Sequence, residues 1–113
     1  MKENGKYSRP LNVPKAVDDE IMFRLKEAKA TYRKSSKNGV VVDLIEQGLP
    51  LLQTLGDFAI HRKVEGVDYV RINLSISLEQ REYNYVKALK DKFGAEITMI
   101  LYSALLKGIG QNG

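Results

Sequence analysis

The same order of short segments occurs twice in this chain: an extended segment of alternating apolar and polar residues, an amphipathic helix, a tight turn and a second, more apolar helix. We assign residues 9–53 to the first copy, residues 54–68 to a connector and residues 69–113 to the second copy. A chain of 113 residues can bury one modest core, whereas a single copy of about fifty residues is marginal alone. Residues 9–113 are therefore expected to form one compact domain, preceded by a flexible arm at residues 1–8.

The second copy begins with a segment that alternates strictly between apolar side chains and side chains that form hydrogen bonds. Because successive side chains of a strand point to opposite faces, residues 70–77 predict a strand with one apolar face. Its other face contains Arg71, Asn73 and Ser75. A two-stranded ribbon with such a face fits the major groove of DNA, although an Arg-Asn-Ser row also occurs on the solvated side of ordinary sheets.

The first copy predicts a strand at residues 10–15, with Leu11 and Val13 facing inward. Pro10 and Pro14 flank Asn12 on the outward face. Proline has no N–H group, but both prolines have the same parity, so both missing donors can be on the side away from the partner strand. The two prolines are therefore compatible with a ribbon in which every strand is an edge strand.

Two helices are expected in each copy, and local signals mark their ends. Asp18 and Asp19 favour a helix start, and Arg33 and Lys34 favour its end, because of the helix dipole. The apolar face at residues 41–52 predicts the next helix, and Pro50 predicts that it kinks there or ends just before.

In the second copy, Ser77 and Gln80 have the spacing of a capping box, which predicts the start of a helix that runs toward Phe93. Gly94 is expected to end that helix with a left-handed residue. A last helix is expected from about Glu96. In the connector, two apolar runs on either side of Glu65–Gly66 favour a hairpin.

Composition narrows the classes of function. The formal net charge of +4 and the pI near 9.3 are compatible with a polyanionic partner, and equally with none. The chain has no cysteine, no glycine-rich phosphate loop and no cluster of metal ligands, and its one histidine, His61, lies in a basic stretch. We therefore expect no enzyme activity, no metal and no cofactor. No apolar run approaches the ~20 residues of a membrane span, so a soluble cytoplasmic protein is expected.

This order of elements resembles the ribbon-helix-helix, or MetJ/Arc, superfamily of DNA-binding proteins. In that superfamily two copies of strand, helix and helix pair their strands into an antiparallel ribbon that enters the major groove. Because this chain carries both copies, the resemblance implies an intramolecular pseudo-dimer with an α+β, mostly helical fold. Two ribbon-helix-helix motifs would share a two-stranded antiparallel ribbon and a four-helix core. Aligning the copies sets Leu11 against Ile72, Asn12 against Asn73, Asn38 against Thr98 and Leu44 against Ala104.

The resemblance implies two sets of DNA contacts. Base contacts are expected at Asn12, Arg71, Asn73 and Ser75. Contacts to the DNA backbone are expected at Arg9, Lys15, Ser36, Lys37, Asn38 and Thr98. Asparagine is suited to adenine and arginine to guanine. Since the first strand offers only Asn12 between its two prolines, the DNA sequence that is read is expected to be asymmetric.

The resemblance further implies a sequence-specific double-stranded DNA-binding protein, a transcriptional repressor of a plasmid or other mobile element. Its expected partners are double-stranded DNA and further copies of the chain on repeated sites, with no membrane. Its expected location is the cytoplasm, on nucleoid or plasmid DNA. Two alternatives remain open at this stage: an accessory protein of a DNA-processing complex such as a conjugative relaxosome, and an antitoxin-like protein-interaction module.

Overall fold

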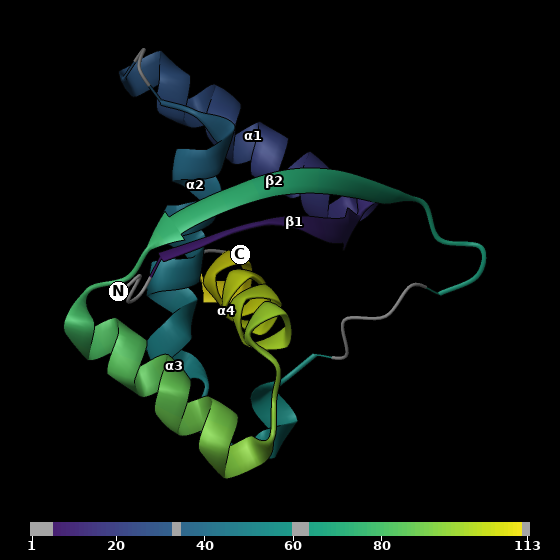
Figure 1. Ribbon diagram of the computed structural model, residues 1–113. Coiled ribbons are helices and arrows are strands. Elements are labelled where there is room, and N and C mark those ends of the chain that lie inside the picture. Colours follow the sequence, from purple (N-terminus) through teal and green to yellow (C-terminus); the bar gives the residue numbers. More distant parts are fainter. Residues whose placement is uncertain (1–5, 33–34, 60–63, 112–113) are drawn as a thin grey trace.

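The computed structural model describes residues 6–32, 35–59 and 64–111 (Figure 1). Within these residues the fold is α+β and mostly helical, with a two-stranded antiparallel sheet and four α-helices, as the sequence predicts. In chain order the elements are β1 (Lys6–Pro14), α1 (Lys15–Thr31), α2 (Lys37–Gly48), two 3-10 turns (Leu49–Leu51 and Leu55–Asp57), β2 (Tyr69–Ser77), α3 (Gln80–Phe93) and α4 (Ile97–Gln111). Arm residues 1–5, Arg33, Lys34 and His61 lie outside the described residues.

The two strands come from the two halves of the chain and pair along their whole length. Leu11 lies opposite Ile72, and Lys6 lies opposite Ser77. The expected first strand at residues 10–15 and the expected arm at residues 1–8 are therefore wrong in their bounds, because residues 6–8 belong to β1 and Lys15 begins α1. The backbone of residues 6–9 finds its ladder partners on β2, and Tyr7 packs against the core.

The hydrogen-bond pattern of the ribbon accommodates both prolines. The Lys15 N–H, just beyond β1, donates across the ribbon to the Asp68 carbonyl at 2.8 Å. Hydrogen bonding alternates along an antiparallel strand, so odd-numbered β1 residues bond across the ribbon and even-numbered ones point their N–H groups outward. Pro10 and Pro14 have the outward parity, and no ladder bond is lost at either residue.

Helices α2 and α4 cross on the inner side of the ribbon: in Figure 1, α2 passes behind the ribbon and α4 lies below it, with α1 at the top and α3 at the lower left. The crossing is so close that Cβ atoms cannot be accommodated at two glycines. A Cβ at Gly48 would lie 1.8 Å from the Ala104 carbonyl oxygen, and one at Gly108 would lie 2.0 Å from the Leu44 carbonyl oxygen. The core of the protein is built around this contact and the inner face of the ribbon, with fully buried residues that include Leu11, Val13, Val41, Ile45, Leu74, Ile100, Leu101 and Leu105.

The ends of α2 and α3 match some of the sequence signals and contradict one. Helix α2 ends at Gly48 and Pro50 lies in the following 3-10 turn, as the proline predicts. Gly94 has φ +67° and caps α3 in the left-handed conformation, also as predicted. The predicted capping box at Ser77 and Gln80 is wrong, because β2 continues through Ser77 and the box is formed instead by Glu79 and Glu82.

The connector contains no hairpin among its described residues. Phe58 and Ala59 have no strand structure, and β2 pairs with β1. Val64 also forms no strand, and residues 60–63, the rest of the expected first arm of the hairpin, lie outside the described residues. The described part of the connector packs on α4 instead. The Ala59 N–H donates to the buried Ser103 Oγ at 2.8 Å. Asp57 Oδ1 forms an ion pair with Lys107 Nζ at 3.0 Å.

Asp57 makes the stability of this region sensitive to acid. Its Oδ2 accepts from the Gln53 and Thr54 N–H groups at 2.8 and 2.9 Å. These bonds, and then Lys107, hold the pKa of Asp57 well below its ordinary value of 3.8. A lowered pKa stabilises the folded state at pH values above the ordinary pKa, and that stabilisation is lost as the pH falls toward the folded-state pKa. We expect Asp57→Asn to remove this part of the acid sensitivity, measured by urea unfolding between about pH 2 and 7. If the free energy of unfolding falls equally steeply with pH for both proteins below about pH 4, this prediction is contradicted.

Among the described residues, no single helix is both long enough and apolar enough to cross a membrane. By length and composition alone, α3 and α4 pass that test as a pair, but they are bent by 111° relative to each other.

Candidate nucleic-acid interface

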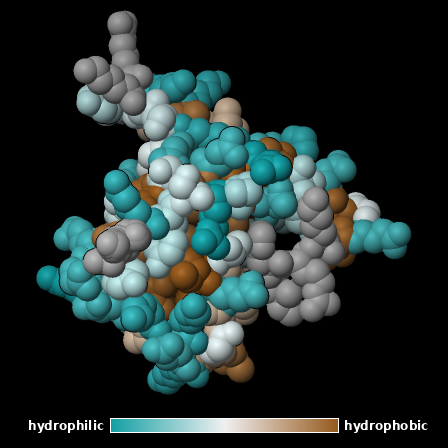
Figure 2. Space-filling view, viewed as in Figure 1, coloured by the Kyte–Doolittle hydropathy of each residue, from teal (hydrophilic) through white to brown (hydrophobic). Residues whose placement is uncertain are grey.

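The outer face of the ribbon brings the four predicted base-contact residues together. Tyr7, Leu11 and Val13 of β1 and the even positions of β2 face the core, whereas Arg9 has the same parity but is exposed. The remaining side chains of the ribbon point outward. On the outward face Asn12 lies opposite Arg71, and Asn73 lies opposite Pro10. Arg71, Asn73 and Ser75 are exposed, whereas Asn12 is half-buried. The surface over β2 carries hydrophilic and intermediate side chains (Figure 2).

The N-terminus of α2 is attached to the outer edge of β2. The Asn38 Nδ2 donates to the Ser75 carbonyl and the Ser75 N–H donates to Asn38 Oδ1, both at 2.9 Å. Asn38, a predicted contact to the DNA backbone, thus continues the hydrogen-bond ladder of the ribbon with its side chain. Ser36 caps the same helix and accepts from the Gly39 N–H at 3.0 Å.

The N-terminus of α4 lies against the edge of β1. Arg9 Nη1 donates to Thr98 Oγ1 at 3.1 Å, although the two residues are 89 positions apart in the chain. The Arg9 guanidinium also lies 5.9 Å from the centre of the Tyr7 ring. Both predicted backbone-contact residues are therefore in one cluster, and the ribbon has a helix N-terminus beside each of its two strands.

Two further predicted backbone-contact residues carry acidic partners from α1. Lys37 Nζ lies 2.6 Å from Asp18 Oδ1, in a partly buried ion pair. Lys15 Nζ lies 3.0 Å from Asp19 Oδ1, and both side chains are largely exposed. The hydrogen bond to Asp19, and then the charge of Asp19, raise the pKa of Lys15. Lys15 stays positively charged at neutral pH, and its exposed pair is easily exchanged for another anion.

The predicted contact residues omit two residues at one end of the candidate interface. Lys6 and Ser8 share the outward face with Asn12, and they lie opposite Ser77 and Ser75. Part of the signal was present, because Lys6, Tyr7 and Ser8 alternate between polar and apolar side chains, but the charged Arg9 interrupts the pattern. The two prolines obscured it, since prolines usually count against the interior of a strand.

No protein family, curated protein or solved structure matches this chain. Among residues 6–32, 35–59 and 64–111, no group of three or more His, Cys, Asp or Glu side chains is arranged to hold a metal ion.

Proposed function

We propose that this protein binds double-stranded DNA sequence-specifically as a ribbon-helix-helix protein and regulates transcription, as a repressor of a plasmid or mobile element. The observation that carries the proposal is the outward face of the ribbon, where Arg71, Asn73 and Ser75 are exposed in a row. A two-stranded ribbon has the width of the major groove, and its outward side chains can reach base edges.

An internal two-fold relation between the halves of the chain supports the proposal. Leu11 and Ile72, which the alignment of the two copies equates, are also the residues that lie opposite each other in the ribbon. The alignment also equates Leu44 with Ala104. Gly48, four residues after Leu44, packs on Ala104, and Gly108, four residues after Ala104, packs on Leu44. Reciprocal contacts of this kind are the mark of a two-fold symmetric interface. They fit a pseudo-dimer formed within one chain.

The two strands would contribute differently to recognition. Arg71 can donate two hydrogen bonds to guanine O6 and N7, and Asn73 can bond adenine N6 and N7. Directly across the ribbon, β1 offers Asn12 and the apolar ring of Pro10. The preferred DNA sequence is therefore asymmetric, with the stronger requirement on the side read by β2.

The helix N-termini beside the ribbon suit the phosphates that border the groove. Free N–H groups and the helix dipole attract anions there. At α2, Lys37 adds a positive charge, and at α4, Arg9 does so from β1. Glu96, immediately before α4, has the opposite effect.

The proposal is tested by fluorescence anisotropy with the DNA upstream of the gene and with a scrambled duplex of equal length, across a series of salt concentrations. Tight binding to the upstream DNA, with a large ratio over the scrambled duplex at physiological salt, is expected. Equal weak binding to both duplexes, lost as salt rises, would reduce the basic charge to a non-specific property and overturn the proposal.

Arg71→Ala and Asn73→Ala are each expected to weaken binding to the preferred DNA by about 1–3 kcal/mol. Both side chains are exposed, so the thermal unfolding temperature is expected to stay unchanged. Lys26→Ala, which removes an exposed charge from α1, is the control for Arg71→Ala. A loss of folding in either ribbon variant would assign these side chains a structural role instead.

Lys37→Ala is expected to weaken binding to all DNA sequences alike and to reduce the slope of log K against log salt by about one unit. The physical reason is that one fewer phosphate is neutralised, so about one fewer counterion is released. An unchanged slope would mean that Asp18 keeps Lys37 in its ion pair when DNA binds.

A further inference from the structure

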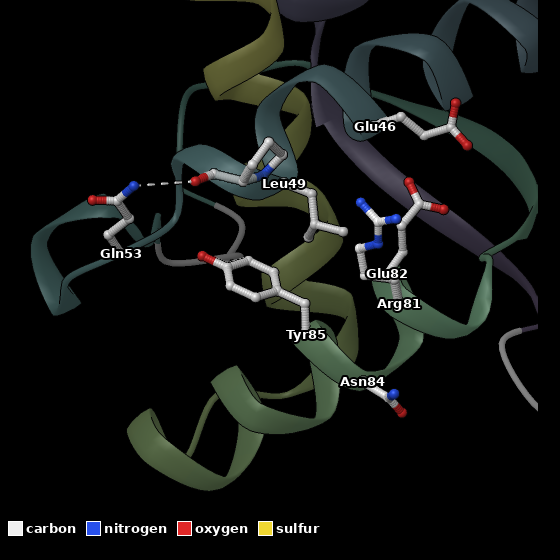
Figure 3. Close-up of a pocket in the computed structure, with 8 residues that line it drawn as sticks. Glu46, Leu49, Gln53, Arg81, Glu82, Asn84 and Tyr85 are labelled. Carbon is white, nitrogen blue, oxygen red and sulfur yellow. Dashed lines mark hydrogen bonds between the residues drawn. The ribbon is translucent and has the colours of Figure 1, made fainter.

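A pocket of about 710 Å³ lies between the end of α2 and the first turns of α3. Its lining residues are Glu46, Leu49, Pro50, Gln53, Arg81, Glu82, Asn84 and Tyr85. Figure 3 shows Leu49 and Tyr85 at its centre, with Glu46, Arg81 and Glu82 on one side and Gln53 on the other. The volume is within the range of about 300–1,000 Å³ that small-molecule sites occupy.

The centre of the pocket is apolar and held in place. Tyr85 Oη donates to the Leu52 carbonyl at 2.6 Å, which fixes the ring over the turn that follows α2. Leu49 is buried and forms the floor of the pocket, whereas Pro50, the next residue, is exposed at its rim. A fixed aromatic ring beside aliphatic side chains is a suitable surface for the flat or branched part of a ligand.

The charged side of the pocket carries an excess of carboxylates. Burial raises the pKa of Glu46, and the negative charges of Glu82, Asp43 and Glu79 raise it further. Glu82 already accepts the Glu79 N–H at 3.0 Å, in the capping box of α3. Glu46 has no ion pair with any of the described residues, and Arg81 is the one cation among the lining residues. A positive charge placed beside Glu46 would therefore be attracted by several carboxylates at once.

We propose that this pocket binds a small organic cation, with an ammonium group against Glu46 and an apolar or aromatic body against Leu49, Pro50 and Tyr85. An ammonium group would form a charge-assisted hydrogen bond with the Glu46 carboxylate. Its positive charge would offset the repulsion between the carboxylates of Glu46 and Glu82. A neutral ligand of the same shape gains only the apolar contact, and an anion meets the acidic side of the pocket. This site is separate from the outward face of the ribbon and does not depend on the proposed DNA binding.

The test is a titration of the 15N-labelled protein, followed by NMR, with phenethylamine, 2-phenylethanol and 3-phenylpropionate as probes. The three probes share a phenyl ring and differ in charge. Phenethylamine is expected to shift the NMR signals of the backbone amides of residues 46–53 and 81–85, and these shifts are expected to saturate. It is expected to bind about tenfold more tightly than the alcohol. The carboxylate is expected to bind most weakly.

Glu46→Gln is expected to weaken the binding of phenethylamine about tenfold and to leave the affinity for 2-phenylethanol unchanged. The reason is that the glutamine amide keeps the shape of the side chain but loses its charge. Glu27→Gln, on the exposed face of α1, is the matched control and is expected to change neither. The wild-type protein gives a second measurement, since its affinity for phenethylamine is expected to fall as acid protonates Glu46. Equal affinities for amine and alcohol, shifts that do not saturate, or an amine affinity that neither Glu46→Gln nor acid lowers would each overturn the proposal.

Discussion

Gly108→Ala is expected to destabilise the protein by about 3 kcal/mol or more, which would be among the largest effects of adding one methyl group to this chain. The added Cβ would lie 2.0 Å from the Leu44 carbonyl oxygen, and that atom belongs to the backbone of α2. A flexible side chain can rotate away from such a contact, but a helix backbone must move as a unit. Helices α2 and α4 would have to separate, which loosens the contacts of buried neighbours such as Ile45 and Leu105.

Gly110→Ala is the control for this prediction, because it lies two residues further along the same helix. A Cβ at Gly110 meets no atom within 4 Å. Alanine has a higher helix propensity than glycine, so this variant is expected to be unchanged or stabilised by up to about 1 kcal/mol. Urea unfolding of both variants measures the difference. Similar stabilities for Gly108→Ala and Gly110→Ala would mean that α2 and α4 do not cross at Gly108.

Leu11→Ala and Ile72→Ala are each expected to destabilise the protein by about 2–5 kcal/mol, because each removes a buried side chain at the centre of the ribbon's inner face. Leu11 is 1% exposed and Ile72 is 3% exposed, and the two residues lie opposite each other. Cross-strand neighbours share one cavity when both are truncated, so the two losses should not add. A double-mutant cycle measured by urea unfolding gives the interaction energy of this pair.

Met22→Ala is the control for these ribbon variants, since Met22 is 44% exposed and its truncation is expected to change stability by less than about 0.5 kcal/mol. The unfolding midpoint of the wild-type protein is also expected to be independent of protein concentration, because one chain supplies both strands of the ribbon. A midpoint that rises with concentration, or additive losses in the cycle, would contradict a ribbon completed within one chain.

Local signals predicted the helices better than they predicted the ends of β1. The left-handed glycine at the end of α3 and the break before Pro50 depend on backbone properties of single residues, so the sequence reveals them directly. The start of β1 at Lys6 depends on pairing with Ser77, which is 71 positions away in the chain. The capping box of α3 is formed by Glu79 and Glu82 instead of Ser77 and Gln80 for the same reason, because the pairing extends β2 through Ser77.

Alternation within each strand predicted that Asn12, Arg71, Asn73 and Ser75 share the outward face of the ribbon, and they do. The surroundings of the residues predicted to contact the DNA backbone could not be predicted in this way. Asn38 and Lys37 were chosen for their position at a helix start, but Asn38 bonds to Ser75 and Lys37 pairs with Asp18. These contacts join separate elements, and no local pattern in the sequence encodes them.

By itself, the sequence determined the periodic features of this protein: two alternating strands, four helices, and an outward face that carries Arg71, Asn73 and Ser75. Those features follow from the geometry of a strand and a helix, which repeats every two and every 3.6 residues. Only the tertiary structure decided the close crossing at Gly48 and Gly108, the partners of Asn38 and Lys37, and the pocket beside Glu46. Each of these depends on distances between residues that are far apart in the chain, and such distances are fixed by packing and hydrogen bonding of the whole fold.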